Sequence, residues 1–587
     1  MKTIVFDTEV FKNLFLLGGL ILETNTFFHI WGDEDDSRQQ LKELFKSSNT
    51  FVSFNGLKYD MPVISYFMSG KSMLETKKLG DEIIQENLMP WDAERKYGFK
   101  IPRVDHIDLI EVAPSFVSLK TYGARMNMPT IQDLPFHHDS LIADEHFETI
   151  LTYCRNDLET TAELYNRLQG QLDLRVQISR EYGFDARSKS DSQVAEQMFM
   201  KRLNLRRGEV NIPPHVKYHL PSFISFRSEE LNSIAERLQA HDFLVKPSSG
   251  HVELPDFLKD DLVKIGGGVY QMGVGGLHSQ HDRKVCFVSD DERCLVDYDV
   301  ASYYPAIILN CNLIPMNTGQ KFLDEYRTLF HRRLEGKRAK NMVIADSLRI
   351  ALNGTFGKTA NRYSPLYSPD VMINIVLTGQ LTLLNLIEQL TDNGIEVVSA
   401  NTDGIMLYYN RQDQQKVEAL VARFSELTKF IFEATPYRSV ALKDVNNYYA
   451  VKEDRSVKIK GIYSAPTLSK NPTAPVVSKA VGAWLSKGTP FKETLANASV
   501  QDFISVRNVT GGGVQGDEYL GRVVRWYQTV DKLPPITYAI NGNKVAKSDG
   551  ARACMTMPVN IPQDLDFEWY FQAIMKTIKD VGASRFL

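Results

Sequence analysis

Acidic residues at the ends of apolar segments are the part of this sequence best suited to chemistry. Asp297 and Asp299 close the apolar run "CLVDYDV", and the aromatic segment "SYYP" (302–305) follows at once. Asp403 lies in "NTDG" (401–404) between two apolar arms, a pattern that predicts a β-hairpin. A carboxylate at a strand end can hold divalent metal ions, and oxygen ligands favour Mg²⁺ or Mn²⁺. Taken alone, however, Asp-Gly in a hairpin is more often simply a good turn.

The N-terminal third holds a second set of candidate site residues: Asp7, Glu9, Asn55, Asp60, Tyr153 and Asp157. Asp7 and Glu9 are two apart on a predicted strand, so both side chains point to the same face. Asp60 is expected at a strand end, and Tyr153 and Asp157 lie four apart on one face of a predicted helix. Each pattern alone is common on a solvated surface, but buried carboxylates are costly without a cation.

Together these carboxylates are the parts of a two-metal hydrolytic site. Such a site holds two divalent ions about 3.5–4 Å apart around a scissile phosphate. Asp7, Glu9, Asp60 and Asp157 are the expected metal ligands, and Tyr153 is expected to orient the attacking water.

These segments resemble known motifs. Asp-x-Glu, Asn-x3-Tyr-Asp and Tyr-x3-Asp occur here in the order of the three exonuclease motifs of proofreading DNA polymerases. "DVASYYP" is similar to motif A of family B DNA polymerases, Asp-x-x-Ser-Leu-Tyr-Pro, with Asp299 at the family's aspartate. The resemblance implies that Tyr304 lies under the sugar of the incoming nucleotide and collides with a 2′-hydroxyl. It gives Asp297 no role.

"RIALNGTFG" resembles motif B of the same family, Lys-x3-Asn-Ser-x-Tyr-Gly. Arg349 stands in place of the lysine and Gly354 in place of the serine, while Asn353 keeps the family's asparagine. Arg333 and Lys337 lie on the predicted helix just before it. The resemblance implies that these cations and Asn353 bind the triphosphate, although basic residues on a helix are more often a solvated face.

"NTDG" resembles motif C, Asp-Thr-Asp-Ser, with Asn401 in place of the first aspartate. The resemblance implies that Asp403, at the family's principal aspartate, binds metal together with Asp299. "VKIKG" (457–461) is similar to a lysine element near the primer terminus, and its spacing leaves the choice between Lys458 and Lys460 open.

Composition excludes several classes of protein. The 587 residues are 43% hydrophobic and 24% charged with a net charge of −4, which argues against a basic, coat-like nucleic-acid binder. Five cysteines form no C-x-x-C pair and are typical of reduced thiols. We find no run of 18 apolar residues and no signal peptide, so we expect a cytoplasmic protein that contacts no membrane.

The resemblance implies a multidomain chain of α/β and α+β class, in which a ribonuclease H-like exonuclease domain precedes a polymerase palm, fingers and thumb. The expected parts are an exonuclease domain at 1–172, a connecting region with a glycine-rich linker at 173–290, palm segments at 291–323 and 359–461, fingers at 324–358 and a thumb at 462–587. Periodicity predicts a strand pair within 1–24, a long helix over 146–172, two helices within 324–358 and a hairpin over 395–409. The palm is expected to be an antiparallel sheet.

The resemblance further implies template-directed addition of dNTPs to a primer 3′-hydroxyl, with 3′–5′ proofreading and two Mg²⁺ or Mn²⁺ ions per active site. Primer–template DNA and dNTPs are the implied partners of a monomer. The compact length is similar to polymerases of phages or mobile elements, which work in the bacterial cytoplasm. Protein-primed phage enzymes carry a large insertion between motifs A and B, for which residues 306–348 leave no room. We therefore expect no priming protein, and a separate processivity factor.

Two alternatives stay open from the sequence. One is a 3′–5′ exonuclease whose polymerase half has decayed, with Asn401 as the first sign. The other is a non-catalytic nucleic-acid clamp. Asp299, Asp403, Tyr304 and Arg349 argue against both, because a decayed or non-catalytic chain has no need of them.

Overall fold

The chain forms two compact units in a computed structural model that describes residues 2–208, 210–273, 275–280 and 284–587. The first unit comprises residues 1–190, 465–476 and 498–570, and the second comprises residues 191–464, 477–497 and 571–587. The expected glycine-rich linker includes Val274, which lies outside the described residues.

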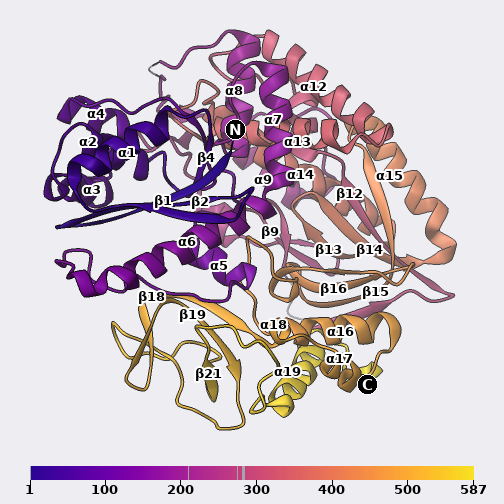
Figure 1. The fold of residues 1–587 in the computed structure, drawn as a ribbon. Helices are drawn as coiled ribbons and strands as arrows, with labels where there is room; N and C mark the ends of the chain where they lie inside the picture. The colour runs from indigo at the N-terminus through magenta and orange to yellow at the C-terminus, as the bar shows by residue number, and fades with distance from the viewer. Residues whose placement is uncertain (1, 209, 274, 281–283) are drawn as a thin grey trace. The chain divides into compact units, whose positions relative to one another are not determined.

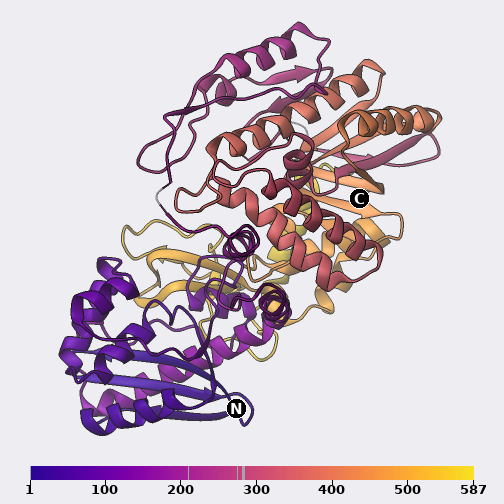
Figure 2. The ribbon, with the colours of Figure 1, turned by 90° about the horizontal axis from the view of Figure 1, so that it is seen from above.

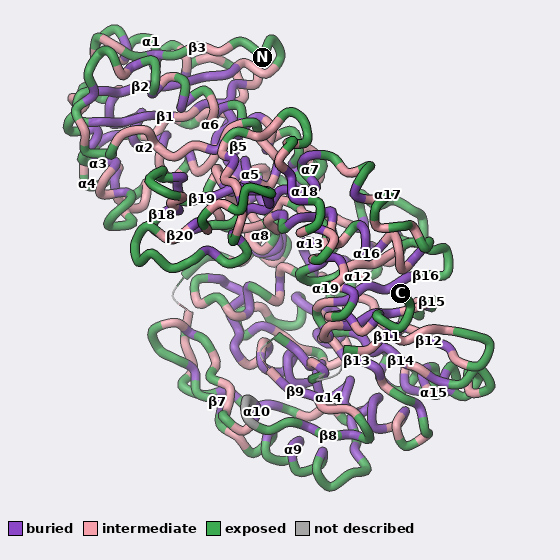
Figure 3. The backbone as a smooth tube through the Cα atoms, turned by 90° about the horizontal axis from the view of Figure 1, so that it is seen from below, coloured by how far each residue is buried: buried purple, intermediate pink, exposed green. Residues whose placement is uncertain are grey.

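The first unit is built on a mixed five-stranded sheet. Its strands, in spatial order, are β3 (Thr26–Ile30), β2 (Leu14–Ile21), β1 (Thr3–Phe11), β4 (Thr50–Ser53) and β5 (Asp105–Asp108). The pairs β1–β2 and β2–β3 are antiparallel, whereas β1–β4 and β4–β5 are parallel. The strand pair predicted within residues 1–24 is therefore confirmed, and Figure 3 shows both of its strands as largely buried.

Helices cover both faces of this sheet. They are α1 (Glu34–Lys46), α2 (Asp60–Met68), α3 (Met73–Gln85), α4 (Pro90–Tyr97), α5 (Leu119–Met126), α6 (Phe147–Arg167) and α7 (Gln169–Tyr182). Ile4 and Phe6 of β1 pack in one core with α1, α2 and α3, while Val5 packs in another with α6, because successive side chains on a strand alternate between faces. Figure 1 shows α1 to α4 on one side of β1 and β2 and α6 on the other.

The single helix predicted over 146–172 is wrong in one respect, because Leu168 is not helical and separates α6 from α7.

A later part of the chain completes the first unit. It contains α18 (Val500–Phe503), β18 (Ser505–Gln515), β19 (Glu518–Gln528), β20 (Thr537–Tyr538) and β21 (Ala551–Ala553). The four strands form an antiparallel sheet in the order β20-β18-β19-β21. Residues 462–587 are thus divided between the two units.

The second unit is built on a ten-stranded sheet. Its strands are β8 (Val263–Ile265), β9 (Gly268–Gln271), β10 (His278–Ser279), β11 (Val285–Val288), β12 (Arg293–Val300), β13 (Glu396–Asn401), β14 (Gly404–Asn410), β15 (Phe432–Asp444), β16 (Asn447–Lys452) and β17 (Val457–Ile459). All described pairings are antiparallel, as predicted for this part of the chain. The main path runs β17-β16-β15-β12-β14-β13-β10-β9-β8, so the predicted hairpin β13–β14 lies beside β12.

The helices of this unit include the two predicted within 324–358, which are α12 and α13. They are α8 (Asp191–Leu203), α9 (Glu229–Ala240), α10 (Asp256–Asp260), α11 (Tyr303–Asn310), α12 (Lys321–Arg338), α13 (Met342–Thr359), α14 (Pro369–Asp392), α15 (Gln414–Thr428) and α17 (Phe491–Ala496). A short pair, β6 (His215–Val216) and β7 (Phe243–Leu244), stands apart from the main sheet. Two helices cross a boundary between units, α16 (Pro475–Lys487) and α19 (Phe567–Asp580). Figure 2 shows α12 and α13, coloured rose to salmon, from a second direction.

Helix α14 is long and apolar enough to cross a membrane by length and composition. However, 94% of its most apolar window is buried inside the protein, which is the property of a core helix. The mixed α/β, multi-unit fold class predicted from the sequence is confirmed.

Candidate functional site

Two aspartates far apart in the sequence meet at the end of β12. Asp299 lies opposite Gly404 in the register of β12 and β14, and the Val300 N–H donates to the Asp403 carbonyl with an N–O distance of 2.8 Å. A Cβ atom at Gly404 would lie 2.1 Å from Asp299 Oδ1, so any larger residue here would displace the Asp299 carboxylate. The tight hairpin thus brings Asp403 beside Asp299, as the sequence predicted.

A cavity of about 430 Å³ lies over these two carboxylates, and Asp297, Lys458 and Lys460 also line it. Burial, followed by the nearby Asp299 charge, raises the pKa of Asp403, while Lys460 and Lys458 oppose that rise. Burial and then Asp299 raise the pKa of Asp297 to about 6, with Lys458 opposing. Several carboxylates that share one cavity favour a bound cation, and their oxygen atoms suit Mg²⁺ or Mn²⁺.

Asn401, which stands in place of a motif C aspartate, lines the same cavity. Its Nδ2 donates to Asn446 Oδ1 at 3.2 Å and lies 3.5 Å from the Val445 carbonyl oxygen. Thr402 Oγ1 donates to Asn401 Oδ1 at 3.2 Å. The amide therefore ties the hairpin to the turn after β15.

Two of the predicted phosphate-binding cations lie on α12. Arg333 is 8% exposed and donates through Nη1 to Ser302 Oγ, three residues after Asp299. Its Nε is buried and has no hydrogen-bond partner among the described residues. Lys337 Nζ lies 3.4 Å from the Glu433 carboxylate, and Glu433 is the register partner of Asp299 on β15. Both cations are thus attached to neighbours of Asp299.

The other predicted nucleotide-binding residues lie on α13 and α11. Arg349 is 56% exposed in its side chain and pairs with Asp346 at 3.4 Å, while Asn353 is exposed. Arg349 is near enough to Arg333 to lower its pKa, after burial as the larger cause. Tyr304 is half-buried, and its ring centroid lies 4.6 Å from that of Phe356. These residues lie outside the lining of the cavity over Asp299.

The first unit brings its predicted acidic residues together. Asp7 and Glu9 share the face of β1 that packs against α6, and Tyr153 and Asp157 project from α6 itself. Burial is the largest cause of a raised pKa at both acidic residues of β1, with Asp60 next for Asp7 and Asp157 next for Glu9. Burial raises the pKa of Asp157 as well. The four carboxylates therefore form one cluster, in which Glu9, Asp60 and Asp157 are buried and Asp7 is partly exposed.

Asp60 corrects one prediction. It does not end a strand, because β4 ends at Ser53 and Asp60 is the first residue of α2. The Thr8 N–H donates to Asp60 Oδ1 at 3.1 Å, which fixes the carboxylate beside β1. Asn55, at φ 68°, turns the chain between β4 and α2. Burial raises the pKa of Asp60 to about 7 although Thr8 opposes it.

The sequence did not indicate two further residues of this cluster. Lys120 on α5 donates to the Tyr153 hydroxyl, and its Nζ lies 3.9 Å from Asp157 Oδ2. Asp108, at the end of β5, accepts the Asn55 and Leu57 N–H groups at 2.7 and 2.9 Å. A buried strand end was the only available signal for Asp108, and no motif marked Lys120.

Cys154 also lies near the cluster, because its sulfur and oxygens of Asp7 and Glu9 lie within 4.8 Å of one another. Burial, and then Glu9 and Asp7, raise the pKa of the Cys154 thiol. The thiolate is the form that binds metals, so the oxygen ligands are the better fit here. The cluster accordingly suits Mg²⁺ or Mn²⁺.

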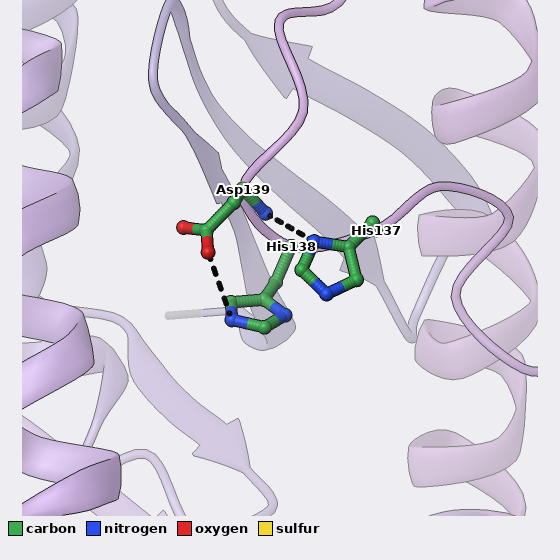
Figure 4. A group of neighbouring side chains, drawn as sticks. All are labelled: His137, His138 and Asp139. Carbon is green, nitrogen blue, oxygen red and sulfur yellow. Dashed lines mark hydrogen bonds and ion pairs between the residues drawn. The ribbon is translucent and has the colours of Figure 1, made fainter.

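A second group of possible ligands lies on an exposed loop of the same unit. His138 Nε2 lies 3.5 Å from Asp139 Oδ2, and the Asp139 N–H donates to His137 Nδ1 at 3.3 Å (Figure 4). The Lys77 ammonium lies 3.3 Å from Asp139 Oδ1 and already supplies a positive charge to it. This group is therefore explained as a polar surface loop.

Comparison with known proteins points to one family. No protein-family model matches the chain. A stretch of 209 residues, 29% of this chain, is 22% identical to DNA polymerase 1 of Sulfolobus acidocaldarius and covers 24% of that protein. A stretch of 122 residues, 20% of this chain, is 23% identical to DNA polymerase 1 of Saccharolobus solfataricus and covers 14% of it. The chain resembles DNA polymerases of family B.

The matched parts span about a quarter or less of these polymerases, at 24% and 14% of their lengths. Among solved structures, the family B DNA polymerase of the hyperthermophilic archaeon Pyrobaculum calidifontis is similar at a TM-score of 0.41 and 13% identity. That similarity covers 100% of this chain and 78% of the polymerase, and its TM-score is too low to support an inference. Activity must therefore be argued from the residues of this chain.

Proposed function

We propose that this protein is a template-directed DNA polymerase with an associated 3′–5′ exonuclease. The observation that carries the proposal is the meeting of Asp299 and Asp403 in one cavity that two lysines, Lys458 and Lys460, also line. Paired carboxylates and cations in one hollow fit a site that handles metal-bound phosphates. The likeness to DNA polymerases agrees with this proposal.

In the polymerase site, Asp299 and Asp403 would hold two Mg²⁺ or Mn²⁺ ions. When bound, such ions favour the deprotonated primer hydroxyl and neutralise the charge of the departing pyrophosphate. The primer 3′-oxygen forms a bond to the α-phosphorus of the dNTP, and the bond to pyrophosphate breaks. The primer hydroxyl gives its proton to solvent water in this step.

The cations on α12 and α13 supply the binding of the triphosphate in this proposal. Arg333 and Lys337 are attached beside Asp299, and Arg349 lies near Arg333. The unpartnered Nε of Arg333 leaves a donor for a phosphate oxygen. Asn353, which lies on α13 with Arg349, adds a polar contact to the nucleotide. Tyr304 lies under the deoxyribose.

The exonuclease site of the proposal is the carboxylate cluster of the first unit. Asp7, Glu9, Asp60 and Asp157 would hold two metal ions there, and Tyr153 orients the attacking water. Lys120 keeps the tyrosine hydroxyl in place by donating to it. A frayed primer end reaches such a site more easily than a paired one, which favours removal of mismatches.

The domain roles follow from this proposal. The first unit up to residue 172 acts as exonuclease, the ten-stranded sheet as palm, and α12 and α13 as fingers. A thumb within 462–587 stays a prediction. The proposed partners are primer–template DNA, dNTPs and a separate processivity factor, and the proposed setting is replication of phage or mobile-element DNA by a monomer in the bacterial cytoplasm.

The proposal is tested by one pair of reactions on a labelled primer annealed to a longer template. With Mg²⁺ and four dNTPs the primer should lengthen, and with Mg²⁺ alone it should shorten from its 3′ end. EDTA should stop both reactions, and added Mg²⁺ should restore them. Shortening without any lengthening would instead support an exonuclease with a decayed polymerase half, and binding without either reaction would support a clamp.

A further inference from the structure

Asp297 is a carboxylate in the proposed polymerase site that the proposed mechanism does not use. It stands two residues before Asp299 on β12, so both side chains point to the same face of the sheet. Asp297 is only 6% exposed. A buried carboxylate needs a charged or hydrogen-bonding partner, because water no longer solvates it.

Asp297 has two such partners. Its Oδ2 lies 3.3 Å from Lys458 Nζ and accepts from the Tyr437 hydroxyl at 3.4 Å. Lys458 comes from the edge strand β17, which β16 and β15 separate from β12 in the sheet. The lysine side chain therefore reaches across two strands to meet this carboxylate.

The sheet register separates Asp297 from the proposed metal ligands. Asp299 and Asn401 both lie opposite Gly404, in the row at the hairpin tip. Asp297 lies opposite Met406, as does Ser399, in the next row. Asp297 is thus set back from the tip by one row, a position that suits binding a lysine better than binding a metal ion.

The ammonium of Lys458 has fixed neighbours, yet its side chain stays partly exposed to solvent. Its Nζ lies 5.8 Å from the centre of the Tyr437 ring, and its side chain keeps 29% of its exposure. A lysine ammonium has three N–H donors, and Asp297 takes one of them. The Tyr437 and Tyr448 hydroxyls also lie beside the ammonium, which still faces the cavity that Lys458 and Tyr448 line. Lys460, by contrast, is exposed.

We propose that Asp297 is a positioning residue that fixes Lys458, so that the lysine binds the terminal nucleotide of the primer strand in the cavity. A lysine already held in place loses less side-chain freedom when DNA binds, so more of the interaction is left as affinity. This inference rests on the proposed function for the identity of the ligand. The pairing of Asp297 with Lys458 stands on the geometry alone.

A double-mutant cycle tests the proposal. Asp297→Asn, Lys458→Met and the double variant are compared with the wild-type chain for binding of fluorescent primer–template DNA in EDTA, which prevents cleavage. Asp297→Asn should weaken binding about tenfold, the loss expected for one hydrogen bond to a charged group. In the Lys458→Met background the same change should alter binding less than about twofold, because the two residues act as one unit.

Kinetics separate positioning from general damage. In primer extension, Asp297→Asn should raise the KM for primer–template DNA and leave the KM for dNTP and kcat nearly unchanged. Asp297→Glu keeps the charge and should bind DNA more tightly than Asp297→Asn. Lys416→Met, which removes an exposed lysine on α15 outside the cavity, is the matched control and should behave as wild type. Asp297→Ser replaces the asparagine variant in the cycle if that variant does not fold.

Two results overturn the proposal. One is an equal effect of Asp297→Asn in the wild-type and Lys458→Met backgrounds, which would mean that Asp297 does not act through Lys458. The other is a change in the KM for dNTP rather than for DNA. A wild-type chain that binds primer–template DNA but never extends it would overturn the proposed polymerase function instead, and the binding cycle would still decide the role of Asp297.

Discussion

At the scale of single residues, the two carboxylate groups of this chain differ in what balances their charge. In the first unit, Lys120 is the cation that opposes the raised pKa of Glu9 and Asp157. In the second unit, Lys458 and Lys460 oppose the raised pKa of Asp403. Both groups keep an excess of negative charge, so divalent cations should bind at both. A substitution in one group should therefore remove one activity and leave the other intact.

This independence predicts that synthesis and editing can be separated. Asp403→Asn should lower dNTP incorporation by about a thousandfold, equivalent to about 4 kcal/mol of transition-state stabilisation, and leave 3′–5′ degradation intact. Asp7→Ala combined with Glu9→Ala should do the reverse. Incorporation and degradation rates on one labelled primer measure both effects. Normal extension by Asp403→Asn would show that the hairpin aspartate is not a metal ligand.

Tyr304 should discriminate between sugars. Its half-buried ring packs on Phe356 of α13 and lies 6.4 Å from the ring of Tyr303, so it is held in place. Tyr304→Val should open space for a 2′-hydroxyl and raise the ratio of rNTP to dNTP incorporation by roughly 10- to 200-fold. The measurement is kcat/KM for matched rNTP and dNTP. An active variant with the wild-type ratio would contradict this role.

Replacing Asn401 with aspartate should not increase the rate of nucleotide incorporation. Its Nδ2 donates to Asn446 Oδ1 at 3.2 Å, and a carboxylate in its place would face that oxygen and the Val445 carbonyl. Asn401→Asp should therefore lower the free energy of unfolding by about 1 kcal/mol without raising the extension rate. Denaturant unfolding and single-nucleotide incorporation measure the two effects. Faster incorporation would show instead that a metal ligand is missing here.

At the scale of elements, α8 accounts for the glycine at position 354, where the resemblance to motif B would place a serine. A Cβ atom at Gly354 of α13 would lie 2.8 Å from both Ala195 Cβ and the Asp191 carbonyl oxygen of α8. A buried ion pair of 2.8 Å between Lys358 and Glu196 joins the same two helices. The serine of the family pattern does not fit against α8, so the glycine follows from helix packing.

This packing predicts opposite effects for two neighbouring glycines. Gly354→Ala should lower the free energy of unfolding by about 1–3 kcal/mol, the usual cost of overpacking, although alanine is the better helix former. Gly357→Ala is the matched control, because no atom lies within 4 Å of the Cβ it would add. It should be neutral or raise stability by up to about 1 kcal/mol. Equal effects of the two variants would contradict the close approach of α8.

Local sequence patterns predicted the helices and strands whose residues are close together in the chain. The strand pair β1–β2, the hairpin β13–β14 and the helices α12 and α13 follow from alternation, turn residues and helical periodicity. The contacts that prediction missed join residues that lie far apart in the sequence. Asp297 and Lys458 are 161 positions apart, and Lys120 and Tyr153 are 33 apart on different helices. Asp60 was placed on the wrong element because its strand ends seven residues earlier, at Ser53.

At the scale of the whole molecule, the chain returns to its first unit after building the second. Residues 498–570 belong with residues 1–190, and the fully buried Arg525 joins them. Its guanidinium donates to the carbonyl oxygens of Met128 and Pro129 at 2.8 and 3.0 Å, and to that of Met555 at 2.7 Å. The sequence carried no local signal for this return, because the buried arginine is satisfied only by carbonyls from distant segments.

The route of the chain between motifs A and B bears on how synthesis starts. Residues 306–348 contain the end of α11, a connection over 311–320, α12 and the first residues of α13. The described residues there form no further subdomain. The resemblance associates protein priming with a large insertion at this point, so for the proposed polymerase we predict that no priming protein is needed.

The proposed polymerase should therefore extend an ordinary RNA or DNA oligonucleotide annealed to a template. No enclosing insertion is found in the described part of 358–400 either, since α14 and β13 account for most of it. Extension should then be distributive unless a separate factor is added. The measurement is the product length from an annealed primer with a free 3′-hydroxyl, with and without excess unlabelled DNA as a trap. Synthesis that begins only when a protein hydroxyl is supplied would contradict the prediction, and long products in the presence of the trap would show that the chain encloses its DNA by other means.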